Sequence, residues 1–247
     1  MSLYVEVILL VAAGVVSGAL NVVAGGGSFL ILPILLFMGL PSPLANGTNR
    51  VGILAQNFVG TVGFHQHGAM DWPWSLQASI PTMIGAAVGV WAALDIPDLA
   101  FRRTLSIAMV VVTVWSLLNR QNPGAASDVK PPSHWLVVLG FFIVGVYGGF
   151  IQAGIGFLIL AITTAAGMDL VRGNAVKLLT VMMLTIISLI AFAAAGQVDW
   201  PRGLALAAGN WAGAIIGVRM AVLKGHGWLQ KVVTATVILF AVALWFQ

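Results

Sequence analysis

The chain has 247 residues, of which 60% are hydrophobic and only 7% are charged. A soluble domain carries about 25% charged residues, so this composition excludes a soluble globular protein and predicts an integral membrane protein. The net charge of +4 does not indicate a nucleic-acid partner, because most basic residues lie in short segments between apolar runs, where membrane orientation requires them. The absence of cysteine excludes disulfides, thiolate nucleophiles and cysteine-ligated metals.

A membrane-spanning helix needs about 20 apolar residues, and the apolar runs predict an all-α, polytopic protein with about eight transmembrane segments. In chain order the runs are 3–24 with 28–40, 44–66, 72–94, 99–118, 134–153 with 156–168, 171–195, 200–223 and 227–246. The first and fifth segments are broken. The polar stretch 120–133 is the linker between a first transmembrane repeat, 1–119, and a second, 134–247.

The two halves share one pattern of motifs. GAMDWP at 68–73 recurs as GQVDWP at 196–201, and IGAAVGV at 84–90 recurs as AGAIIGV at 212–218. AGGGS at 24–28 has its counterpart in AGIGF at 153–157. Internal duplication is common in secondary transporters, which bind substrate at the repeat interface. Four spans in each repeat predict parallel repeats, whereas a broken segment that crosses twice would make the repeats inverted.

Basic residues suggest an orientation for these spans. With eight spans, Arg102 and Arg103 fall on the side that carries most of the Lys and Arg, and Arg202 falls on the other. Because basic residues are enriched on the cytoplasmic side, both termini are expected outside. The GxxxG pairs at 85–89 and 213–217 predict close helix packing, either inside the protomer or in a homodimer.

The first broken segment contains three consecutive glycines, Gly25, Gly26 and Gly27, followed by Ser28. Non-helical backbone at membrane depth survives only where it is buried in protein or lines a cavity. A helix that begins near Ser28 would present unpaired N–H groups and partial positive charge, which predicts a cradle for an anion. The second half offers the same device at Gly154 and Gly156. The alternative is that these glycines only permit tight helix crossing.

Two basic residues lie inside apolar segments, whereas every acidic residue lies near a segment end or in a loop. Arg50 and Lys177 occupy near-equivalent positions, about two turns into the second and sixth segments. A charge inside the membrane indicates function by default, and an Arg fork suits an oxyanion. The alternative is that both side chains reach the headgroups. Asn21, Asn49 and Gln152 would complete the hydrogen bonds to a substrate.

No enzyme, cofactor or metal site is predicted. His65 and His67 lie near Asp71, but the sequence places no further ligand beside them. HExxH, GxSxG and a catalytic carboxylate pair are absent. An anion channel or uniporter would use the same cationic pocket and stays open as the alternative to a carrier. A scaffold subunit would need neither cations at depth nor duplicated helix breaks.

The order of these motifs resembles the sulfite exporter TauE/SafE family. AGGGSFLILPILLFMGLPSPLANGTNRV resembles the signature of its first repeat, through the glycine cluster, Pro33, Gly39, and Ala45 with Gly47 and Thr48. GVYGGFIQAGIGF, GNAVKLL and GQVDWP resemble its second repeat, including a lysine that corresponds to Lys177. The resemblance covers about residues 10 to 240.

The resemblance implies a permease of the bacterial cytoplasmic membrane for anions such as sulfite, sulfonates or sulfoacetate. The family's usual Gly-Ile-Gly-Gly-Gly is Val23-Ala24-Gly25-Gly26-Gly27 here, and its usual Thr-Ser is Thr48-Asn49-Arg50. The added arginine would favour substrates with more charge or more oxygens. We therefore expect a secondary transporter that moves a small oxyanion by alternating access of two repeats. Its partners would be the anion and the lipid bilayer, with a proton or sodium as possible coupling ion.

Overall fold

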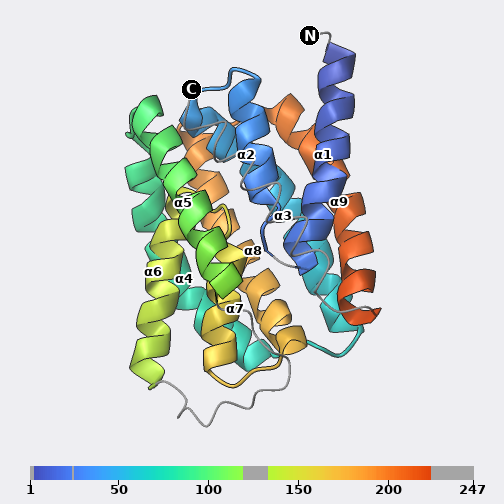
Figure 1. Ribbon diagram of the computed structural model, residues 1–247, viewed down its shortest axis with the longest axis vertical. Helices are drawn as coiled ribbons and strands as arrows, with labels where there is room; N and C mark the ends of the chain where they lie inside the picture. Colours follow the sequence, from blue (N-terminus) through green and yellow to red (C-terminus); the bar gives the residue numbers. More distant parts are fainter. Residues whose placement is uncertain (1–2, 24, 119–132, 224–247) are drawn as a thin grey trace.

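The computed structural model describes residues 3–23, 25–118 and 133–223, and every regular element in these ranges is an α-helix (Figure 1). The helices are α1 (Leu3–Val23), α2 (Ser28–Phe37), α3 (Ser42–Gln66), α4 (Trp72–Leu94), α5 (Asp98–Leu118), α6 (His134–Phe150), α7 (Ile155–Ala165), α8 (Leu170–Ala194) and α9 (Trp200–Leu223). The all-α prediction is confirmed for this part of the chain. The expected segment 227–246, and the expected linker apart from residue 133, lie outside the described residues.

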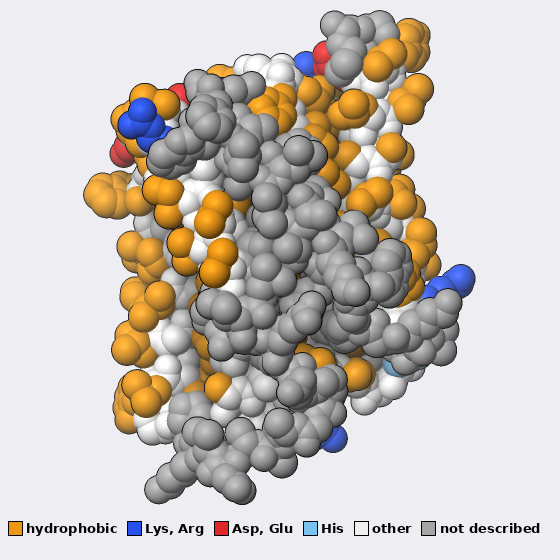
Figure 2. Space-filling model, in the orientation of Figure 1, with side chains coloured by type: hydrophobic (Ala, Val, Ile, Leu, Met, Phe, Trp, Pro, Cys, Tyr) orange, Lys and Arg blue, Asp and Glu red, His pale blue; other side chains and the backbone are white. Residues whose placement is uncertain are grey.

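Four of the described helices are long and apolar enough to cross a membrane. They cover Tyr4–Val23, Trp72–Leu94, Leu170–Ala194 and Trp200–Ala221. Hydrophobic side chains cover the flanks of the molecule in Figure 2, and Ile80, Ile84 and Trp91 on α4 are more than half exposed. An apolar surface of this extent marks a membrane-facing region. The count of eight spans stays a prediction.

The repeated Asp-Trp-Pro motif begins α4 and α9. Asp71 accepts a hydrogen bond from the backbone N–H of Trp74 at 3.2 Å, and Asp199 accepts one from Arg202 at 3.1 Å. A carboxylate at the N-cap satisfies a donor that the first turn leaves free. The proline in the first turn removes a donor that would have no partner there. The motif therefore sets where these two helices begin.

Two helical hairpins, each with a helix break at its tip, determine in which direction the helices after them run. In Figure 1, α1 begins at the top and α2 returns to the top, whereas α6 begins at the bottom and α7 returns to the bottom. Glu6 in the first turn of α1 pairs with Arg202 in the first turn of α9, so both helices begin at the same end. The structure therefore differs from the expected single crossing, because the chain reverses where Gly25 adopts a φ of +82°.

The reversal also corrects the expected distribution of basic residues. The carboxylate of Asp98, one turn before Arg102, accepts a hydrogen bond from the first residue of α3 at 2.7 Å. The N–H of Asp199, three residues before Arg202, donates to a side chain in the second turn of α3 at 2.9 Å. Arg102 and Arg202 thus lie at the same end of the protein. Their predicted placement on opposite sides is wrong, because it counted each broken segment as one crossing.

Glycines allow the two halves of the chain to interleave. A Cβ atom on Gly213 of α9 would lie 2.0 Å from the carbonyl oxygen of Val15 in α1. A Cβ atom on Gly85 of α4 would lie 2.2 Å from the carbonyl oxygen of Phe142 in α6. Backbones can approach this closely only without side chains between them. The GxxxG pairs therefore pack helices inside the protomer, and each pair, α1 with α9 and α4 with α6, joins one half of the chain to the other.

The two helix breaks meet inside the protein. A Cβ atom on Gly25 would lie 2.5 Å from the Cα atom of Gly156, and a Cβ atom on Gly156 would lie 2.5 Å from the Cα atom of Gly25. The two segments of the chain cross here with backbone against backbone. Gly25 is doubly constrained, because its positive φ is also a conformation that other residues adopt at a penalty.

We expect Gly85→Ala to lower the stability of the detergent-solubilised protein, because the new methyl group meets the Phe142 carbonyl in the rigid backbone of α6. Overpacking of this kind lowers the free energy of unfolding by about 1–3 kcal/mol. Thermal unfolding followed by tryptophan fluorescence measures the effect. The control is Gly140→Ala in α6, where the methyl group meets only the end of the Ile162 side chain, at 3.1 Å. Equal losses in the two variants would contradict the packing account.

Candidate functional site

A pocket lies beside the crossing of the two breaks. Its lining comes from the ends of α1 and α2, from α3, from the break before α7, and from α7 and α8. The lining residues are Asn21, Gly25, Ser28, Ile53, Gln56, Asn57, Gln152, Ile155, Gly156, Lys177 and Val181. The structure therefore brings together these residues expected at the site from the sequence: Asn21, Gly25, Ser28, Gln152, Gly156 and Lys177.

The other expected residues lie behind this lining. Gly26 and Gly27 form the break itself, and the N–H of Gly27 donates to the Asn21 side chain at 2.7 Å. Gly154 precedes α7 with a φ of +73°. Asn49 and Arg50 are buried in α3 and do not line the pocket.

Sequence reasoning left Ile53, Gln56 and Asn57 out of the site. All three line the pocket from α3. Their spacing of three and four residues places them on one face of a helix. This spacing was the available signal, but polar residues of transmembrane helices also serve helix packing, so it could not single them out.

Lys177 joins α8 to the end of α1. Its Nζ donates to the carbonyl oxygens of Asn21 at 2.9 Å and Val22 at 3.0 Å, and to the side-chain oxygen of Asn174 at 2.6 Å. The last carbonyls of a helix have no partner within it, and a cation there also opposes the negative end of the helix dipole. Lys177 is 2% exposed, so the alternative that it reaches the lipid headgroups is wrong.

Arg50 of α3 caps the end of α6 in the way that Lys177 caps the end of α1. Its guanidinium donates to the carbonyl oxygens of Gly149 at 2.6 Å and Gly148 at 3.2 Å. It also donates to the side chain of Gln152 at 2.6 Å and lies over the ring of Phe192, 4.8 Å from its centroid. Each half of the chain thus supplies the cation that caps the interrupted helix of the other half.

Gln152 connects Arg50 with the pocket. Its side-chain oxygen accepts from Arg50, its amide donates to Thr185 on α8, and it lines the pocket. Its φ is +66°, and among the described residues it is the one non-glycine residue with a positive φ. Such backbone strain persists only where the surroundings enforce it, and it is concentrated at functional sites. Arg50 therefore acts on the pocket through Gln152 in this closed arrangement.

Positive charge dominates the electrostatics of the pocket. The helix ends at the breaks contribute about +0.5 each from α2 and α7 and about −0.5 each from α1 and α6, so they cancel. The charges of Lys177 and Arg50 remain. None of the lining residues is Asp or Glu. Two basic side chains, one in the lining and one behind it, are thus not balanced by any carboxylate of the lining, which favours binding of an anion.

The pocket is small in this arrangement. Its space for the centres of water molecules is about 20 Å³, and roughly 10–15 Å³ by this measure holds one water. A multi-atom anion therefore enters only after the helices around the pocket separate.

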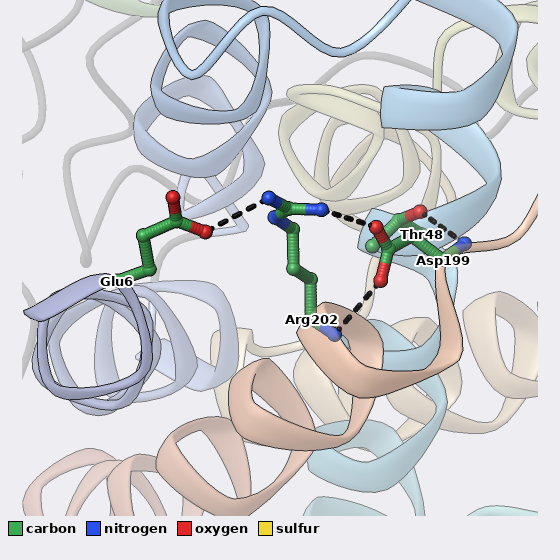
Figure 3. Close-up of polar contacts among 4 residues, drawn as sticks. All are labelled: Glu6, Thr48, Asp199 and Arg202. Atoms are coloured by element: carbon green, nitrogen blue, oxygen red, sulfur yellow. Dashed lines mark hydrogen bonds and ion pairs between the residues drawn. The ribbon is translucent and has the colours of Figure 1, made fainter. Parts of the chain in front are cut away.

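A cluster of charged groups closes the end at which α1, α3 and α9 begin (Figure 3). Arg202 contacts Glu6 of α1 at 2.8 Å and pairs with Asp199. The N–H of Asp199 donates to the hydroxyl of Thr48 in α3 at 2.9 Å. Arg202 thus ties α9 to α1 through Glu6, and the backbone of Asp199 ties the start of α9 to α3 through Thr48.

The residues for a metal centre are not gathered in the described part of the chain. No group of three or more His, Cys, Asp or Glu residues is placed there to hold a metal ion. His67 contacts the carbonyl oxygen of Gly63 in its own helix at 2.7 Å.

Comparisons with known proteins agree with one another. The model of the family described as "Sulfite exporter TauE/SafE" matches residues 10–244. A "Probable membrane transporter protein" of Haemophilus influenzae is 24% identical over 91% of this chain and 89% of its own length. A "Probable membrane transporter protein ORF9" of a Sinorhizobium species is 24% identical over 95% and 89%. The "Probable membrane transporter protein YfcA" of Escherichia coli is 23% identical over 88% and 81%. No solved structure matches the chain.

We expect Lys177→Met to destabilise the protein, because it leaves the buried Val22 carbonyl at the end of α1 without the donor that Lys177 supplies. An unsatisfied buried polar group costs about 1–3 kcal/mol, so a loss of this size in the free energy of unfolding is expected. The matched control is Arg172→Met on the same helix, whose exposed ion pair with Asp169 is worth about 0–1 kcal/mol. Urea unfolding in detergent compares the two. A Lys177→Met variant as stable as Arg172→Met would contradict the capping role.

Proposed function

The chain belongs to the sulfite exporter TauE/SafE family, and on this premise we propose that it is a secondary transporter for a small oxyanion. Family and relatives make it a membrane transporter. Sulfite, a sulfonate or a related organic anion is the proposed cargo. The observation that carries this proposal is the pocket lined by Lys177, with Arg50 bonded to the lining residue Gln152 and no Asp or Glu in the lining.

The proposed contacts to the anion follow from the geometry. Lys177 lines the pocket directly, and Arg50 is connected to it by its hydrogen bond to Gln152. Backbone N–H groups at the starts of α2 and α7 are the proposed further donors, from Gly26 and Ser28 on one side and from Gly154 and Gly156 on the other. The N–H groups of Gly25 and Gly27 donate to α1 in this arrangement, so these two glycines are proposed to shape the site. Asn21 and Gln152 complete the set at the pocket, and Asn49 lies one layer behind it. Donors from two helix starts suit an anion with several oxygens.

Alternating access of two inverted repeats is the proposed mechanism. Helices α3 and α4 begin at residues 42 and 72, and α8 and α9 begin at residues 170 and 200, so both pairs differ by 128 residues. The corresponding hairpins point in opposite directions (Figure 1). Inverted repeats that meet at a central site can open alternately to either side. The small volume of the pocket favours such a carrier over an open channel.

The relatives are bacterial proteins, and the proposed location is the bacterial cytoplasmic membrane with the N-terminus outside. Arg172 and Arg219 lie at the end opposite Glu6, near the start of α8 and the end of α9. The described residues alone carry no excess there, because Arg102, Arg103 and Arg202 lie at the Glu6 end. Arg120, Lys130 and Lys224 follow α5 and α9 in the sequence and lie outside the described residues. The proposed orientation rests on the sequence order of these three residues and on the enrichment of basic residues on the cytoplasmic side. A crossing by 227–246 would return the C-terminus to the outside.

We expect one anion of the proposed class to stabilise the purified protein against heat. The panel comprises sulfite, sulfate, thiosulfate, sulfoacetate, isethionate, acetate and chloride, with zwitterionic taurine as the charge control. A ligand at 100 times its dissociation constant adds about 2.7 kcal/mol to the folded state. The shift on adding ligand is compared in wild type, Lys177→Gln, Arg50→Gln and the control Arg172→Gln. Retention of the full shift in Lys177→Gln, or a full response to taurine, would contradict the cationic site.

Counterflow in proteoliposomes separates a carrier from a channel. A carrier loaded with unlabelled anion exchanges it for external labelled anion, so label accumulates transiently above its equilibrium level. A channel or uniporting pore equilibrates the label without this overshoot. We expect the overshoot with the anion that gives the largest thermal shift. If binding is saturable but no overshoot is seen, the protein conducts the anion as a channel and the proposal of alternating access is wrong.

A further inference from the structure

Three buried carboxamides lie together next to the pocket without hydrogen-bond partners. Asn49 and Asn210 are each 1% exposed, and Gln56 is 2% exposed. Both polar atoms of Asn49, both of Asn210 and the oxygen of Gln56 lack a partner. A buried polar group left unpaired costs about 1–3 kcal/mol, so several in one place are a substantial penalty. Something must interact with these groups in the working protein.

The Asn210 carboxamide fills the space at Gly52 of α3, between Asn49 and Gln56 along the same helix. A Cβ atom on Gly52 would lie 2.5 Å from Nδ2 of Asn210, so the Asn210 carboxamide of α9 occupies the space that this glycine leaves. Asn49 lies three residues before Gly52 and Gln56 four residues after it, and this spacing puts both on the same face of α3. Gln56 also lines the pocket. The cluster is therefore continuous with the site described above.

The other half of the chain lacks this cluster. The position equivalent to Asn210, 128 residues earlier, is Thr82 of α4. The Thr82 hydroxyl donates to the carbonyl oxygen of Ala78 in its own helix at 2.7 Å, so it needs no further partner. The positions equivalent to Asn49 and Gln56 are Lys177 and Leu184. Among the described residues, the unpaired carboxamides thus occur on the α3–α9 side and not on the α4–α8 side. Helix packing by itself does not account for them.

Local charge decides which ligand fits. Gln56 shares the pocket with Lys177. Asp199 lies just before α9, and its N–H reaches Thr48 beside Asn49, but its carboxylate is paired with Arg202. A cation at the cluster would therefore meet Lys177 without an unpaired carboxylate to balance it. The unpaired NH2 groups of Asn49 and Asn210 each offer two N–H donors, which suits an anion, whereas the unpaired atom of Gln56 is its oxygen.

We propose that Asn49, Gln56 and Asn210 form a second, uncharged binding position for the transported anion, between α3 and α9 and next to the central pocket. This inference rests on the proposed function, because it names a step on the path of the same anion. Neutral donors hold an anion less tightly than Lys177 does, and transport needs positions that bind and also release. The anion would pass between the carboxamides and the cationic pocket.

Cysteine labelling tests this position, because the chain contains no cysteine of its own. Asn210→Cys and the matched control Thr82→Cys are treated in membrane vesicles with an anionic sulfonatoethyl and a cationic trimethylammonioethyl methanethiosulfonate. We expect Asn210→Cys to react about tenfold faster with the anionic reagent, the lower end of what a cleft of one charge sign produces. Thr82→Cys is expected to react with neither. Asn49→Cys replaces Asn210→Cys if the latter fails to fold.

Two labelling results would overturn the proposal. Equal rates with both reagents would show a water-filled crevice without selectivity for anions, and no reaction in either Asn variant would show a dry packing cluster. Reaction of Thr82→Cys at the same rate would also overturn it, because the site would then not be specific to the α3–α9 side.

Flux separates this inference from the proposed function. In the counterflow assay we expect Asn210→Leu to exchange the anion about tenfold more slowly than Thr82→Val, because its donors to a charged ligand are lost. The thermal shift that the same anion gives is expected to stay at the wild-type level, because it reports the pocket at Lys177. Unchanged exchange in Asn210→Leu overturns the second position while the transporter stands. If the wild type shows neither a thermal shift nor exchange with any anion of the panel, the proposed function is wrong. The labelling rates then decide by themselves whether the carboxamide cluster admits anions.

Discussion

Two helices end in the interior of a protein that sits in lipid, and their last carbonyl groups need hydrogen-bond donors there. Water is not available at that depth, and an unpaired backbone group is expensive. Lys177 and Arg50 supply the donors, each from the half of the chain that does not contain the helix it caps. The charges needed for this capping are also the charges that a substrate would meet. Structure and binding chemistry therefore draw on the same two side chains.

The glycines set which parts of the fold can move. Contacts of glycine with the backbone in the α1–α9 and α4–α6 pairs leave no side chain that could rearrange between the helices. Close packing of this kind behaves as one rigid unit. The breaks, by contrast, hold the positive φ angles of Gly25, Gln152 and Gly154 and join segments that are tied by a few hydrogen bonds. Opening of the pocket is therefore most easily accommodated at the breaks, with the helix pairs moving as bodies.

Helix positions could be predicted from the sequence more fully than the site. Apolar length and the Asp-Trp-Pro motif placed the helix limits within a few residues, because both act locally. The direction of the chain after Gly25 could not be predicted, since it depends on a contact with Gly156 far along the sequence. The expectation for Lys177 identified a pocket residue, but not its bonds to α1. Asn210 was not considered, because its significance depends on the space that Gly52 leaves in another helix. Long-range pairing was the missing information in each case.

The interleaving of the halves has a consequence for how this protein is made. During synthesis α1 enters the membrane long before α9 exists, yet its glycine-lined face packs on α9 and its last carbonyls receive a donor from Lys177 of α8. The end of α1 therefore lacks this cationic cap until Lys177 has been translated. Contacts so distant in sequence form late and slowly, and exposed intermediates of this kind are prone to misassembly. Membrane insertion must therefore keep the early helices from packing against wrong helices until the second half has been made.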